Sequence, residues 1–145
     1  MKYEKSCGAV VFTRVAGQIK FALVQQLQGF YSFPKGHVEH GESEQETALR
    51  EIFEELHIKP TLIEGFRTVD EHVIPHKPDV IKQIVYFLGE YADQEIVFQR
   101  EELLGAPLVT YEEAMALFQY ESSKRILKEA YDFIFGNVDK VEDLE

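Results

Sequence analysis

The segment 36–58, which reads GHVEHGESEQETALREIFEELHI, constrains this chain more than any other part of its sequence. It contains seven Glu and one Arg, and so holds much of the formal net charge of -11. Ser43 followed three residues later by Glu46 is a capping-box pattern that starts a helix. Pro60 prevents the continuation of that helix. The segment therefore predicts a helix over 43–56 with a concentrated anionic face.

The charged and apolar residues of this helix fall on opposite sides. At about 100° per residue, the carboxylates of Glu51, Glu54 and Glu55 lie within roughly 100° of one another. The apolar residues predict the buried stripe: Leu49, Ile52, Phe53 and Leu56. Clustered carboxylate oxygens are the ligands that Mg2+ prefers in proteins. A solvated acidic helix face is the alternative that this pattern alone leaves open.

The same segment resembles the Nudix box, G-x5-E-x7-R-E-U-x-E-E-x-G-U, where U is a bulky apolar residue. The matching residues are Gly36, Glu42, Arg50, Glu51, Ile52, Glu54, Glu55 and Ile58. His57 stands where the family has Gly, and a Gly after the last helical turn normally adopts a positive φ. His tolerates this conformation better than most residues, so the departure concerns the helix end more than metal binding.

The resemblance implies a Nudix fold of the α/β class, in which a mixed β-sheet is sandwiched between helices. It also implies Mg2+ or Mn2+ as the cofactor, bound by Glu51, Glu54 and Glu55. The backbone carbonyl of Lys35 is a further candidate ligand. Such proteins often take another metal-shell glutamate from a loop beyond the sheet, and the position of this loop before the helix at Thr110 favours Glu102 over Glu101. An acidic loop without that role remains the alternative.

Catalytic roles are implied for four residues of the box: Glu54, Glu51, Arg50 and Glu42. Arg50 is expected to orient the carboxylates, and Glu42 to support the metal shell or the loop. One helix glutamate is expected to be the general base, and the sequence leaves open which one.

Residues around the box are similar to those of the asymmetrical diadenosine tetraphosphate hydrolases. PKGHVE at 34–39, followed by GE at 41–42, carries the resemblance, as do CGAVVF, FALVQQ and IEGF elsewhere. The substrate contacts that it implies come from Lys35, His37, Lys82, Tyr86 and Tyr31. Lys82 and Tyr86 are four apart in an expected strand and so share a face. An exposed lysine and a core tyrosine are the structural alternatives for these two, and loop positions are the alternative for the histidines.

The remaining pattern predicts one α/β domain at 1–136 and an acidic tail at 137–145. Apolar runs predict strands at 7–12, 20–25, 62–69 and 81–91, with a loop at 72–79. Two further helices are expected, at 110–118 and from Ser122 or Ser123 to Gly136.

Composition excludes several classes of protein. A chain of 145 residues fits one domain, and its acidity, with a pI near 4.9, argues against neutralisation of duplex nucleic acid. No apolar stretch is long enough to cross a membrane. Cys7 is the only cysteine, which excludes an intrachain disulfide and a thiolate zinc site. A cytoplasmic monomer or homodimer that binds a small nucleotide polyphosphate is the resulting expectation.

The expected reaction is metal-dependent hydrolysis of diadenosine tetraphosphate to ATP and AMP. The box does not choose the group attached to the pyrophosphate, so four other substrates stay open: a nucleoside triphosphate, a nucleotide sugar, an RNA 5' end or an inositol pyrophosphate. A Nudix module that binds a nucleotide without catalysis is the non-enzymatic alternative. Loss of box glutamates is its expected signature, and all of them are present.

Overall fold

Two long parallel strands form the centre of the protein. The computed structural model describes residues 2–143, with side chains through residue 136. In it, β1 (Lys2–Val15) and β8 (Lys77–Glu90) pair in parallel, in a register that joins Lys2 to Val80 and Phe12 to Glu90. Five shorter strands complete a mixed seven-stranded sheet by antiparallel pairing: β2 (Gln18–Ala22), β5 (Lys35–His37), β6 (Thr61–Leu62), β7 (Thr68–Ile74) and β10 (Leu108–Val109). A second sheet has three short strands: β4 (Tyr31–Ser32), β3 (Val24–Gln26) and β9 (Leu103–Gly105).

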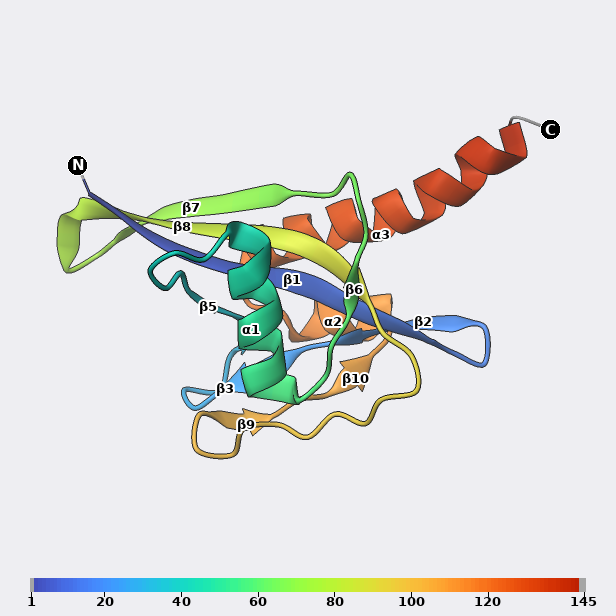
Figure 1. Cartoon of the computed structure of the whole chain (residues 1–145), viewed down its shortest axis with the longest axis horizontal. Helices are drawn as coiled ribbons and strands as arrows, with labels where there is room; N and C mark the ends of the chain where they lie inside the picture. Colours follow the sequence, from blue (N-terminus) through green and yellow to red (C-terminus); the bar gives the residue numbers. More distant parts are fainter. Residues whose placement is uncertain (1, 144–145) are drawn as a thin grey trace.

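Helices cover both faces of the central sheet. α1 (Glu44–Leu56) lies over one face, and α2 (Tyr111–Leu117) and α3 (Glu121–Asp143) lie over the other (Figure 1). Two separate apolar clusters fill the interfaces, one on each face. The expected α/β architecture, a mixed sheet between helices, is confirmed. None of the helices in residues 2–143 is long and apolar enough to cross a membrane.

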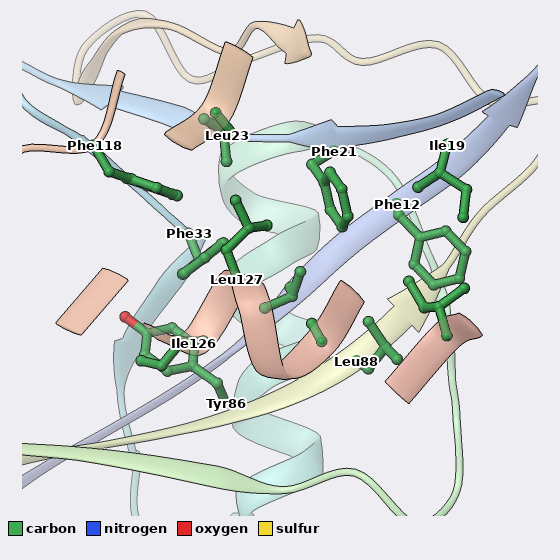
Figure 2. Close-up of a cluster of buried hydrophobic side chains, with 14 of the residues drawn as sticks. Phe12, Ile19, Phe21, Leu23, Phe33, Tyr86, Leu88, Phe118, Ile126 and Leu127 are labelled. Carbon is green, nitrogen blue, oxygen red and sulfur yellow. The ribbon is translucent and has the colours of Figure 1, made fainter. Parts of the chain in front are cut away.

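The alternation of side chains along β1 divides its residues between the two clusters. Val10 and Phe12 belong to the α3 side, where they pack with Ile126 and Leu127 (Figure 2). Cys7, Ala9 and Val11 belong to the α1 side. Successive residues of a strand point to opposite faces, so the continuous apolar run CGAVVF is what a strand buried on both faces requires.

The edge of β1 is shared between two partners, and this arrangement positions the loop before α1. Its second half pairs with β2, while Ser6–Gly8 pair with β5. Between these two paired stretches of β1, the Ala9 amide donates to the Pro34 carbonyl at 3.3 Å. A Cβ on Gly8 would lie 2.1 Å from that carbonyl oxygen. Only glycine therefore lets β5 approach β1 and direct the chain into α1.

The capping box at the start of α1 is confirmed, but its buried face differs from the prediction. Ser43 accepts from the Glu46 amide and Glu46 accepts from the Ser43 amide. Leu49 and Phe53 are exposed. The buried residues are Thr47, Ala48, Ile52, Glu55 and Leu56. The buried stripe is thus rotated towards Glu55, because the first residue of β5 and the segment after β8 both hydrogen-bond to that side of the helix.

Three further predictions of local structure were wrong. The strand expected at 62–69 is split into β6 and the start of β7. The loop expected at 72–79 is the tip of a hairpin, in which only Pro75 and His76 form the turn between β7 and β8. The last helix, expected to end at Gly136, continues to Asp143.

Candidate active site

Arg50 is the hub of the carboxylate cluster. Its guanidinium donates to Glu42 twice, at 2.6 Å and 3.0 Å. It also donates to Glu51 at 2.9 Å and to Glu54 at 3.2 Å, and to the backbone carbonyl of His37 at 2.9 Å. These bonds raise the pKa of Arg50 above its ordinary value. The planar fork therefore ties the loop before α1 to two carboxylates of the helix, as the resemblance implied.

Glu42 is held from both sides in this arrangement. One of its oxygens accepts from the Glu39 amide at 3.0 Å and from the Thr47 hydroxyl at 2.9 Å. The hydrogen bonds from Arg50, followed by that from Glu39, lower the pKa of Glu42 to about 2. Glu42 is therefore ionised at neutral pH and fixes Arg50, rather than serving as an acid or a base.

The carboxylate of Glu51 lies against Gly36 in β5, where any side chain at position 36 would displace it. A Cβ on Gly36 would lie 2.0 Å from the carboxyl carbon of Glu51. The pKa of Glu51 is raised, first by burial and then by the neighbouring Glu54, while the bond from Arg50 lowers it. Gly36 is thus required because the carboxylate and the strand share this space.

Glu55 is the most buried of the three helix glutamates, with 8% of its surface exposed. Its carboxylate accepts from the Lys35 amide at 3.0 Å. Burial, followed by the charge of Glu51, raises the pKa of Glu55 to about 8, although the charge of Lys35 acts in the opposite direction. A buried acid with a raised pKa and an acidic neighbour is a group that a nearby cation would ionise.

The helix carboxylates Glu51, Glu54 and Glu55 line one cleft of about 300 Å3. Its lining residues are Gln26, Lys35, Glu51, Glu54, Glu55, Gln99, Glu102 and Leu103. The exposed Glu102 therefore faces the helix carboxylates from the loop before β9, whereas Glu101 is not among the lining residues. The cleft brings together every residue named as a metal ligand from the sequence.

The residues of the cleft fit a hard divalent cation. Within residues 2–136, whose side chains are described, no three His, Cys, Asp or Glu side chains are arranged to hold a metal ion as they stand. The carboxylates are instead directed towards other donors: Arg50 donates to Glu51 and Glu54, and the Lys35 amide donates to Glu55. Four carboxylates nevertheless share the cleft, and two of them have raised pKa values. A bound cation would relieve this accumulation of charge, so the donor set suits Mg2+ or Mn2+.

Lys35 lines this cleft, and the charge of Lys82 acts on it. Burial lowers the pKa of Lys35, and the charge of Lys82 lowers it further, while Glu55 and Glu51 oppose the shift. Lys82 comes from β8 and Lys35 from β5, on either side of β1. Their positive charges would attract a polyphosphate anion to the side of the acidic cleft that Lys35 lines.

The other residues named as substrate contacts lie in different environments. Tyr86 is 4% exposed, and its ring packs edge-on against Phe33 with centroids 5.4 Å apart (Figure 2), so it lies in the core, which is the structural alternative given for this residue above. Tyr31 is half-buried at the margin of the core. The side chain of His37 is exposed, and its backbone carbonyl accepts from Arg50.

Sequence reasoning missed three residues that contribute to the site. Gln26 and Gln99 line the cleft, and Thr47 is fully buried beneath Glu42. Gln99 gave no local signal because it is far along the chain from α1. Thr47 could have been found, since a hydroxyl one turn before Arg50 lies on the side of the helix that faces the preceding loop.

Comparison with known proteins gives consistent matches. The family model described as NUDIX domain matches residues 2–130. The asymmetrical bis(5'-nucleosyl)-tetraphosphatase of Mus musculus is 34% identical over 142 residues, which cover 90% of this chain and 95% of that protein. The protein of the same name from Sus scrofa is 35% identical with the same coverage. The crystal structure of a C. elegans Ap4A hydrolase binary complex matches with a TM-score of 0.84 and 26% identity, covering 92% of this chain and 98% of that chain.

Proposed function

This chain belongs to the Nudix family, and on that premise we propose that it is a metal-dependent hydrolase of dinucleoside polyphosphates, cleaving diadenosine tetraphosphate to ATP and AMP. The observation that carries the proposal is the cleft in which Glu51, Glu54, Glu55 and Glu102 meet, beside Lys35. Support for the substrate comes from the mouse and pig relatives, which are named as asymmetrical tetraphosphatases and match nearly the full chain.

The cofactor in this proposal is Mg2+ or Mn2+, held by Glu51, Glu55 and Glu102, with Glu54 at the open side. When bound, such an ion polarises the bridging phosphate and lowers the pKa of a water molecule. The protein supplies the fixed carboxylates. Arg50 keeps Glu51 oriented through a bond of 2.9 Å, and Glu42 keeps Arg50 in place from the opposite side.

Glu54 is the proposed general base. Its side chain is 48% exposed and opens on the cleft, and its one side-chain hydrogen bond is the 3.2 Å contact from Arg50. Glu51 and Glu55 are more buried and more tightly held. A base must reach the proton that it removes, so the carboxylate that is free to turn towards a water molecule suits this role best.

Lys35 and Lys82 are proposed to bind the polyphosphate. When water attacks the phosphorus next to one adenosine, negative charge develops on the leaving ATP. Two lysines near that oxygen stabilise the charge because the site is partly withdrawn from water. Tyr31, half-buried at the rim, is the proposed stacking partner for a base.

The function is tested by incubating the purified protein with Mg2+ and separate substrates: diadenosine tetraphosphate, ATP, ADP-ribose and a triphosphorylated RNA. Products are resolved by chromatography. The proposal expects the highest kcat/KM for diadenosine tetraphosphate, with ATP and AMP in equal amounts. Preference for another substrate by tenfold or more would overturn the substrate assignment while leaving the family intact.

Two matched variants test the role of the helix carboxylate. Glu54→Gln should lower kcat by at least about 100-fold, because it removes the base while keeping the shape of the side chain. Glu101→Gln makes the same change of charge on a residue that does not line the cleft, and it should keep the wild-type rate. Equal rates for the two variants would remove Glu54 from the mechanism.

A further inference from the structure

His57 has a left-handed backbone conformation, which glycine adopts more readily than histidine does. It ends α1 in the left-handed conformation, with φ of 58°, and its amide donates to the Phe53 carbonyl at 2.9 Å. Glycine adopts this conformation without steric cost, and it is the residue of the Nudix box at this place. Unlike glycine, His57 carries a ring that can form hydrogen bonds.

That contribution is a hydrogen bond to the segment after β8. Nδ1 of His57 lies 2.7 Å from the carbonyl oxygen of Val97. A carbonyl oxygen can only accept, so Nδ1 carries the proton in this contact. The ring also packs against Phe53, with centroids 5.6 Å apart, which limits its rotation about the side-chain bonds.

The same segment closes the end of the helix. The Val97 amide donates to the Leu56 carbonyl at 3.0 Å, and the Gln99 amide donates to the Glu55 carbonyl at 3.0 Å. Carbonyls in the last turn of a helix have no partner within the helix, so these two bonds satisfy groups that α1 leaves open. The imidazole adds the only side-chain bond from α1 to this segment among the described residues.

From Gln99 the chain turns directly into the cleft. The Gln99 carbonyl accepts from the Glu102 amide at 3.1 Å and from the Leu103 amide at 2.9 Å. Gln99 and Glu102 both line the cleft opposite Glu55. The direction in which Glu102 points therefore depends on where Gln99 is held.

We infer that His57 is a positioning residue: its imidazole holds Val97, and thereby sets the segment 97–102 so that Glu102 faces the helix carboxylates. The inference rests on the proposed function only in that Glu102 contributes to cation binding. A separate anchor keeps the segment folded without His57, because the Gln94 side chain bonds both the amide and the carbonyl of Lys59, at 2.7 Å and 3.1 Å. Loss of the imidazole should loosen the segment locally.

Two substitutions separate the hydrogen bond from the backbone conformation. His57→Gly removes the donor and restores the residue that suits the left-handed backbone. His57→Asn keeps an N–H donor at the same number of bonds from the main chain as Nδ1, on a residue that also tolerates this conformation. If His57 only ended the helix, Gly would serve at least as well as His, and Asn would offer no advantage over Gly.

Amide hydrogen exchange in metal-free protein is the first readout. In His57→Gly, the amides of residues 97–102 should exchange about fivefold faster than in the wild type, which corresponds to the loss of one hydrogen bond. His57→Asn should exchange at close to the wild-type rate. Wild-type exchange in the Gly variant, or equally fast exchange in both variants, would overturn the inference.

Mn2+ affinity, measured by calorimetry without substrate, is the second readout. His57→Gly should bind Mn2+ about tenfold more weakly, as is common when a residue that supports a ligand is lost. Glu102→Gln should also weaken binding, and adding His57→Gly to it should cause no further loss. Additive losses, or affinity unchanged in either single variant, would overturn the inference. Activity on another substrate would overturn the proposed function alone, because neither readout depends on the substrate.

Discussion

Glu55 is expected to make the metal-free protein less stable as the pH rises, because its buried carboxyl favours the protonated form. The pKa of this buried carboxyl is about 8 in the folded protein and 4.5 in an ordinary environment. Between these values the folded state binds a proton that the unfolded state has released. The free energy of unfolding therefore falls as the pH increases through this window, and the stabilising contribution is complete only below pH 4.5.

The magnitude follows from the width of the window. Each pH unit changes the free energy of unfolding by about 1.4 kcal/mol for one proton. From pH 4.5 to pH 7, Glu55 should therefore cost the folded state about 3 kcal/mol. Glu55→Gln removes this cost, because an amide does not ionise and its oxygen can still accept from the Lys35 amide. The variant should be more stable than the wild type by about 3 kcal/mol at pH 7 and nearly equal to it at pH 4.5.

Urea unfolding at pH 5, 6, 7 and 8 in the presence of EDTA provides the measurement. Comparing the wild type with Glu55→Gln cancels the contributions of titratable groups that do not interact with Glu55. Glu101→Gln is the matched control, and its stability should run parallel to that of the wild type. The reasoning is refuted if the Glu55→Gln curve also runs parallel to the wild type across this range, because Glu55 would then ionise normally in the folded state.

Substitutions at three further residues test individual contacts. Gly36→Ala places a Cβ 2.0 Å from the Glu51 carboxyl carbon. It should lower kcat by at least about 100-fold and the free energy of unfolding by about 1–3 kcal/mol. Wild-type kinetics would contradict the close approach of Glu51 to Gly36. Thr47→Val removes a hydrogen bond to Glu42 and should cost about 1 kcal/mol in urea unfolding, with no change expected if that bond is absent. Tyr86→Phe should leave the melting temperature within a few degrees of the wild type. Tyr86→Ala should lower the free energy of unfolding, measured in urea, by about 4 kcal/mol, because it removes a buried ring. Equal losses of stability in the two variants would contradict burial of the ring.

The sequence predicted the family, the α/β architecture and the start of α1, because these depend on local spacing. Ser43 and Glu46 cap the helix within one turn, and the regular spacing of the box places Glu51, Glu54 and Glu55 on neighbouring faces. Glu102, favoured over Glu101 by the count back from the helix at Thr110, lines the cleft, whereas Glu101 is not among the lining residues.

The buried face of α1 could not be predicted from its own residues. A helical wheel assigns the apolar side to the core, yet Phe53 is exposed and Glu55 is buried. Partners outside the helix decide both outcomes. His57 and Lys59 cover parts of the Phe53 ring at the surface, and the Lys35 amide supplies the hydrogen bond that makes a buried Glu55 tolerable.

The hairpin between β7 and β8 was missed for a related reason. Its arms extend beyond the core, so polar and exposed side chains occupy a region that reads as a loop. Pairing to the long strand β8, rather than burial, sets its conformation. Gly136 was read as the end of α3, but a glycine inside a helix costs only about 1 kcal/mol and does not by itself stop it.

Hydrolysis of diadenosine tetraphosphate in 18O-labelled water with Mg2+, followed by mass spectrometry of the products, tests the central claim most directly. Attack on the phosphorus next to one adenosine, with ATP as the leaving group, should place one 18O atom in AMP and none in ATP. Formation of two molecules of ADP, or no turnover of this substrate under conditions where another pyrophosphate is cleaved, would contradict the claim.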